Sequence, residues 1–138
     1  MATIRFSGID AYMERLQRLE QDSEEILKRA VYDGAAIVAD EVRQRLHAVL
    51  SPDATGQLES SLGISKIQND QGYVNARIGF DGYDSKGVPN QLKANVLESG
   101  STRQPKRPFM RPAVNAARRP AEAKMEQVVE QEIETLMR

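Results

Sequence analysis

The sequence predicts an α+β domain in which a small, mostly antiparallel sheet of about three strands packs against a long helix and a C-terminal helix. Three observations lead to this class. Two long stretches carry apolar residues at helical spacing, short segments between them alternate apolar and polar residues, and turn-forming residues separate the segments. A chain of 138 residues can build one hydrophobic core, so residues 1–138 are expected to form a single domain.

The first elements are predicted to be a short strand and a helix. Residues 2–6 alternate in polarity, as in a strand with one buried face. Ser7 and Asp10 form a capping signal for the helix that follows. That helix is expected to end near Glu20. Its apolar stripe consists of Ile9, Tyr12, Met13, Leu16 and Leu19.

A second, longer helix is predicted to start at Asp22 or Ser23 and to stop before Ser51-Pro52, because the residue preceding a proline disfavours helical geometry. About 28 helical residues span roughly 40 Å, so one end is expected to protrude or to pack on another subunit. Gly34 marks a weak point or a close contact in its middle. The apolar line is Leu27, Val31, Ala35, Val38, Val42, Leu46 and Val49, with Ile26, Ala30 and Ile37 beside it.

Residues 58–67 and 73–80 read as the two strands of a hairpin, joined by a turn at residues 69–72. Leu58, Leu62 and Ile64 are expected to share the buried face of the first strand. Residues 81–90 contain glycine and proline and are predicted to be a flexible loop. Residues 91–98 fit either a short helix or a strand.

The last third of the chain is predicted to be an extended connector followed by a helix. Residues 102–112 hold three prolines, and Pro112 suits the first turn of a helix. Pro120 lies inside the predicted helix, so a kink or a restart is expected there. The buried positions of this helix are Val114, Ala117, Ala121, Met125, Val128 and Leu136, with Val129 and Ile133 flanking them.

The composition argues against several classes of protein. The chain has no cysteine, which excludes disulfides, thiolate metal sites and thiol nucleophiles. A basic and then apolar leader is not visible, and no apolar run approaches the roughly 20 residues of a membrane span, so a soluble protein without membrane contact is expected. The net charge of −1 gives no overall attraction to nucleic acid.

The residue sets used in catalysis are not found in a recognisable pattern. The single histidine, His47, has no carboxylate three or four residues away, so it is interpreted as a surface histidine near a helix end. Phosphate-binding glycine loops and nucleophile elbows do not occur. We therefore expect no enzymatic activity, no cofactor, no metal and no small-molecule substrate.

Charged residues are unevenly distributed along the chain. Glu126, Glu130 and Glu134 recur every four residues, which is typical of a solvated helix face, although a metal-facing edge or a receptor for a basic partner is also compatible. Between Glu98 and Glu122 there is no acidic residue. The same stretch holds the basic residues Arg103, Lys106, Arg107, Arg111, Arg118 and Arg119.

This basic segment has two possible kinds of partner. It could bind phosphates, which makes a nucleic-acid-binding module using Arg103–Arg119 the alternative function. It could equally meet acid-rich helices of a neighbouring chain. Protein–protein pairing is favoured, because only Phe109 could stack on bases within the segment. Phe109 and Met110 belong to residue types enriched at interface cores, but they could also plug the chain's own core.

Three blocks of sequence resemble the phage tail-component family typified by the Hong Kong 97 siphophage. Residues 51–62, following the long helix, are similar to the family pattern P-x-D-T-G-x-L-x-x-S-I, with Ala54 as an extra residue. Residues 94–101 are similar to Y-A-x-x-x-E-x-G-T. Residues 107–113 match R-P-F-[LM]-R-P-A throughout. With the opening strand and helices and the closing helix, the resemblance extends over nearly the whole chain.

The resemblance implies a phage or prophage virion protein, assembled in the cytoplasm of the host bacterium, with no active site. Family members complete the tail or join it to the head, usually as a hexameric ring between the connector and the tail tube. The implied partners are other copies of the chain and the connector, adaptor and tail-tube proteins. The residues predicted to serve assembly are Glu98, Arg103, Lys106, Arg107, Phe109, Met110 and Arg111.

Overall fold

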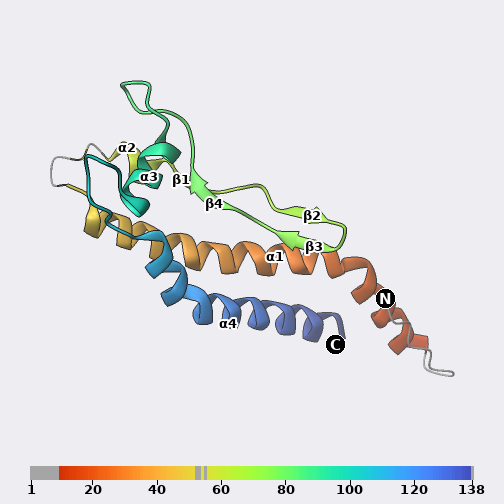
Figure 1. The fold of residues 1–138 in the computed structure, drawn as a ribbon. Coiled ribbons are helices and arrows are strands. Elements are labelled where there is room, and N and C mark those ends of the chain that lie inside the picture. Colours follow the sequence, from red (N-terminus) through yellow and green to blue (C-terminus); the bar gives the residue numbers. More distant parts are fainter. Residues whose placement is uncertain (1–9, 52–53, 55, 138) are drawn as a thin grey trace.

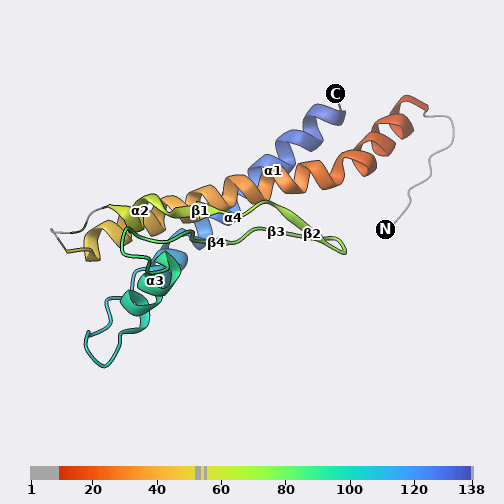
Figure 2. The same ribbon diagram turned by 90° about the horizontal axis from the view of Figure 1, so that it is seen from above.

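The computed structural model describes residues 10–51, 54 and 56–137, and its framework is a pair of long helices. Helix α1 (Asp10–Val49) and helix α4 (Met110–Met137) run antiparallel and in contact (Figure 1). A narrow β-ribbon and the short helices α2 (Gln57–Ser60) and α3 (Asn90–Ser99) lie against them (Figures 1 and 2). The predicted α+β class, with a long helix and a C-terminal helix, is confirmed.

Helix α1 is one continuous helix, so the predicted break near Glu20 is wrong. Residues 20–25 contain no proline or glycine that would end a helix. The Ser23 hydroxyl donates to the Glu20 carbonyl at 2.9 Å within the helix and does not cap a new one. The predicted end before Ser51 is confirmed. The N-terminal turns of α1 extend past the ends of α4 and of the ribbon in both views (Figures 1 and 2). The predicted strand at residues 2–6 and the cap at Ser7 lie outside the described residues.

The contact between α1 and α4 is built largely from small side chains. Gly34 is the close contact that its position suggested, because a Cβ at this position would lie 2.7 Å from Cγ of Met125. The buried face of α1 in this region differs from the predicted apolar line. Leu27, which was predicted to begin that line, is 42% exposed. The buried face in this region contains Ile26 and Ala30 instead, because α4 covers that side of the helix. Among the described side chains, the buried hydrophobic residues of the two helices are Ile26, Ala30, Ala39, Val42, Leu46, Ala113, Ala117, Ala121 and Val128.

The predicted hairpin exists but is split into two short ladders. Strand β1 (Leu62–Ile64) pairs with β4 (Ile78–Phe80), and β2 (Gln68–Asp70) pairs with β3 (Tyr73–Asn75), both antiparallel. The turn is Gln71-Gly72, where both residues have positive φ. Leu58 is not in a strand as predicted: it lies on the single turn of α2, which still directs its side chain into the core.

The ambiguous segment at residues 91–98 is helical, as part of α3. Helix α4 begins at Met110, with Pro112 in its first turn, as expected. It continues through Pro120 without a restart, and its axis bends over the first part of its length (Figure 1). A bend is the expected consequence, because proline removes one backbone donor and crowds the preceding turn.

Within the described residues, none of the helices has both the length and the apolar character needed to cross a membrane.

Candidate assembly site

The three sequence blocks converge on one core at the C-terminal end of α1. Leu58 from the first block, Leu97 from the second and Phe109 from the third belong to one buried cluster with Val42 and Leu46 of α1. The Phe109 ring is 1% exposed and meets the Phe80 ring edge-on, with centroids 5.9 Å apart. Of the two interpretations of the Phe-Met pair, the structure supports the chain's own core for Phe109. Met110 is partly buried and packs on the same cluster.

Glu98 caps the start of α4 from the end of α3. The N–H groups of Phe109 and Met110 donate to its Oε1 at 3.0 and 2.6 Å, and the Arg111 N–H donates to Oε2 at 3.3 Å. These donors have no partner within the helix, so a carboxylate there replaces the usual local cap and also complements the helix dipole. Burial alone would raise the Glu98 pKa, but these three hydrogen bonds and the nearby Arg111 charge outweigh it and lower the pKa.

Gly100 allows the chain to turn sharply between α3 and α4. Its backbone has φ 79° and ψ 177°, a region that is open essentially only to glycine. A Cβ at this position would lie 2.9 Å from the backbone N of Lys106. The turn brings the Arg107 N–H to the Leu97 carbonyl at 2.7 Å. Glu98 and Gly100 together therefore set the path of the third block.

The cations of the third block face the solvent. Arg103, Lys106, Arg107 and Arg111 are all exposed. In the part of the chain that the structure describes, Arg103, Lys106 and Arg107 form no ion pair within 4.0 Å. The structure thus divides the seven predicted assembly residues into a core and cap group, formed by Glu98, Phe109 and Met110, and an exposed basic group, formed by the other four.

A turn before α3 is built around Asp84 and was predicted to be flexible. The Asp84 carboxylate accepts from the N–H groups of Lys86 and Val88, each at 2.9 Å, and pairs with Lys93 Nζ at 2.9 Å. The hydrogen bond from Val88, then the one from Lys93, lowers the Asp84 pKa against the opposing effect of burial. Within the predicted loop, residues 84–88 therefore form a turn that one side chain closes. The Asp84–Gly87 spacing is a signal for such a turn.

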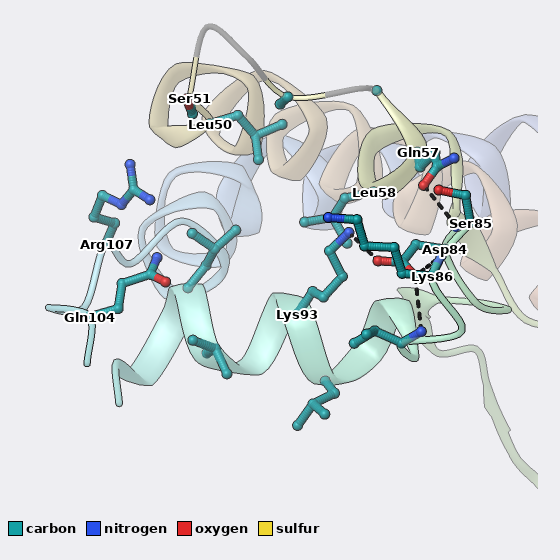
Figure 3. A pocket seen from close by; sticks show the side chains of 16 residues that line it. Leu50, Ser51, Gln57, Leu58, Asp84, Ser85, Lys86, Lys93, Gln104 and Arg107 are labelled. Carbon is teal, nitrogen blue, oxygen red and sulfur yellow. Dashed lines mark hydrogen bonds and ion pairs between the residues drawn. The ribbon is translucent and has the colours of Figure 1, made fainter. Parts of the chain in front are cut away.

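The Asp84 turn borders a pocket of about 490 Å³ between α2, α3 and the segment that leads to α4. Apolar residues of several elements line it, including Leu50, Leu58 and Val96. Lys86 and Lys93 extend into the pocket, and Arg107 stands at its other end (Figure 3). Sequence reasoning missed this pocket, because its lining comes from segments that are far apart along the chain.

His47 is exposed near the end of α1, as interpreted, and it has one partner. Its Nδ1 lies 2.7 Å from Oε1 of Glu59 on α2, a contact between elements that helical spacing could not reveal. Among the described residues, no group of three or more histidine, aspartate or glutamate side chains could hold a metal ion. The geometry of the described residues therefore does not support the interpretation of Glu126, Glu130 and Glu134 as a metal-facing edge.

The two ends of the molecule carry opposite charge. Residues 84–119, around α3 and the start of α4, hold eight basic and two acidic residues. The opposite end, made of residues 17–35 of α1 and 121–137 of α4, holds ten acidic and four basic residues. The acids of α1 nearest the basic end are already paired, Asp40 with Arg43 at 3.0 Å and Glu41 with Arg45 at 2.9 Å. The antiparallel packing of α1 and α4 therefore produces a bipolar subunit.

Comparison with known proteins connects this architecture to one family. The family model described as "Bacteriophage HK97-gp10, putative tail-component" matches residues 10–83, more than half of the chain. This region contains the first sequence block, whereas the second and third blocks lie beyond it. Searches of curated proteins and of solved structures gave no significant match. The family model, the long helix with its hairpin and the first block agree, and the chain belongs to the HK97-gp10-like tail-component family of bacteriophages.

Proposed function

We propose that this chain is a non-enzymatic structural protein of the virion that oligomerises at the head–tail junction or at the tail end. Membership of the tail-component family supports a role in the tail. The observation that carries oligomerisation is the separation of charge between the two ends of the subunit. A positively charged surface at one end and a negatively charged surface at the other favour head-to-tail contact between copies over a symmetric dimer.

A head-to-tail interface that closes produces a ring, and we propose a ring as the assembled form, with six copies as the expected number. Its partners would be other copies of the chain, the connector or adaptor proteins on one side and the tail-tube proteins on the other. Assembly would take place in the cytoplasm of the host bacterium. The exposed basic group, Arg103, Lys106, Arg107 and Arg111, is the surface proposed for these contacts.

Disruption of the gene in a phage or prophage tests the role in the particle. The expected result is particles with unjoined or incomplete tails, and a copy of the wild-type gene supplied in trans should restore them. Electron microscopy of particles with a labelled subunit would locate it at the head–tail junction or the tail end. Infectious tailed particles of normal appearance without the gene would contradict the proposal.

Nucleic-acid binding is the second candidate, because the exposed basic group is open to phosphates. Phosphate contacts predict an affinity that falls steeply with salt concentration. Base stacking has no support in this segment, since its one aromatic ring, Phe109, is buried. Titration of the protein with duplex and single-stranded DNA at several salt concentrations tests this candidate. Absence of binding at low salt would exclude it.

A further inference from the structure

We propose that the pocket beside α3 receives the acidic C-terminal half of α4 from a second copy of the chain. The inference rests on the proposed self-assembly and names the two surfaces that meet. The receiving surface, called here the α3 pocket, comprises the apolar lining with Lys86, Lys93 and Arg107. The inserted surface comprises residues 126–137 of α4.

The α3 pocket leaves apolar side chains in contact with water. Leu92 is 52% exposed and Val88 36% exposed, and both line the pocket next to Val96. The pocket continues inward to Leu58, which belongs to the buried core. An apolar hollow of about 490 Å³ that opens beside exposed aliphatic side chains is typical of a binding site. The occupant must therefore bring apolar side chains.

The charges of the pocket require that the occupant also be acidic. Asp84 is the one carboxylate among the described lining residues, and Lys93 and two backbone N–H groups already engage it. Lys86 and Arg107 form no ion pair in the described chain, and both are exposed. Two unpaired cations at the mouth of an apolar pocket favour a segment that carries carboxylates beside its apolar residues.

The C-terminal half of α4 has this combination. Glu126 and Glu130 are exposed and one helical turn apart, and they form no ion pair among the described residues. Val129 and Ile133 keep the same spacing and are partly exposed. Side chains at this spacing project from one side of a helix, which is how a helix fits into a groove of a partner.

The two surfaces of one copy cannot reach each other. Arg29 of α1 pairs with Glu132 of α4, so the acidic segment lies beside that part of α1. Leu50, just beyond the end of α1, lines the pocket. The intervening 20 residues or so of helix span about 30 Å. The contact must therefore join different copies, and its repetition closes a ring or extends a filament.

Exchange of the charges tests the contact directly. The first variant carries Lys86→Glu and Arg107→Glu, and the second carries Glu126→Lys and Glu130→Lys. Sedimentation velocity over a range of concentrations at low salt should show self-association of the wild-type chain, weakened by about tenfold or more in each variant. An equimolar mixture of the two variants should associate again, because each altered surface then meets its complement. High salt should weaken the wild-type association as well.

A matched control reverses two exposed cations away from the pocket, Lys66→Glu with Arg77→Glu on the ribbon. It changes the net charge as much as the first variant does and should leave association unchanged. Thermal melts establish that each variant is folded. A further variant, Leu92→Asp, tests the apolar part of the pocket and should also weaken association.

Several outcomes would overturn the inference. A wild-type chain that stays monomeric at every concentration would do so, as would a mixture that fails to recover association. DNA binding that is lost in the Lys86 and Arg107 variant, without any self-association, would assign the pocket to another partner. If the first variant still complements the disrupted gene and associates normally, the inference fails while the proposed function stands. If particles assemble normally without the gene, the proposed function itself fails.

Discussion

Replacement of Phe109 by alanine tests whether the third sequence block serves the chain's own core. The ring is 1% exposed, meets Phe80 edge-on and belongs to the cluster that also holds Leu46 and Leu97. Truncation would leave a cavity where α4 starts and would remove the aromatic contact. The variant Phe109→Ala is therefore expected to lose stability as an isolated monomer, before any assembly takes place.

The expected loss follows from the burial of the ring. A fully buried phenylalanine replaced by alanine costs about 3–5 kcal/mol in the free energy of unfolding, and this range includes the edge-on contact. For a chain of this length, the unfolding entropy is roughly 0.3 kcal/mol per kelvin. The midpoint of thermal unfolding should therefore fall by about 10 °C or more. Phe109→Leu keeps most of the volume and should lose much less.

Circular dichroism of dilute protein provides the measurement, because dilution keeps assembly from contributing to the melting point. Tyr83→Ala is the matched control, since this aromatic side chain is 72% exposed and its loss should hardly change the midpoint. A Phe109→Ala midpoint within about 2 °C of the wild type would refute the reasoning. The ring would then have to be exposed in solution and available to a partner.

Three further predictions concern the connections around the core. Gly100→Ala should destabilise the fold by about 1–3 kcal/mol, measured by urea unfolding, because its φ of 79° is strained for alanine and the Cβ would crowd Lys106. Glu98→Gln should cost about 1 kcal/mol at neutral pH. Folding lowers the Glu98 pKa, so its stabilisation is complete above the ordinary carboxyl pKa and is lost as pH falls through the native value. The melting temperatures of wild type and Glu98→Gln should therefore converge as the pH is lowered from neutral to below about pH 4. A difference in melting temperature that stays constant with pH would contradict the role of the charge. Asp84→Ala should speed hydrogen exchange at the Val88 amide, which donates to this carboxylate, and unchanged protection would show that the turn closes without it.

Local sequence patterns predicted the elements whose signals are local. Three of these features depend on backbone chemistry within a few residues. They are the end of α1 before Ser51, the turn at Gln71-Gly72 and the position of Pro112 in the first turn of α4. Prediction failed where two local signals competed. Asp22 and Ser23 can cap a helix, but they are also compatible with a helix interior, and the continuous packing of α1 outweighs their local preference.

The predicted assembly residues divide for a similar reason. Sequence motifs singled out the segment from Arg107 to Arg111, but Phe109 and the neighbouring arginines share one stretch of chain and face opposite environments. The capping role of Glu98 is not visible in sequence, since its donors lie 11 to 13 residues away. The absence of a capping side chain just before α4 is the only local indication that a distant one is needed.

The sequence by itself determined the α+β class, the helical character of the long segments, the positions of the turns and the resemblance to the tail-component family, because these follow from periodicity, proline and glycine positions and local motifs. The tertiary structure alone decided which side chains are buried, how opposite charges collect at opposite ends, and where the α3 pocket forms. Burial, charge and pocket shape depend on which distant segments meet. The antiparallel pairing of α1 with α4 decides where the charges collect, and the packing of α2 on α3 forms the pocket. Neither contact can be read from one stretch of sequence.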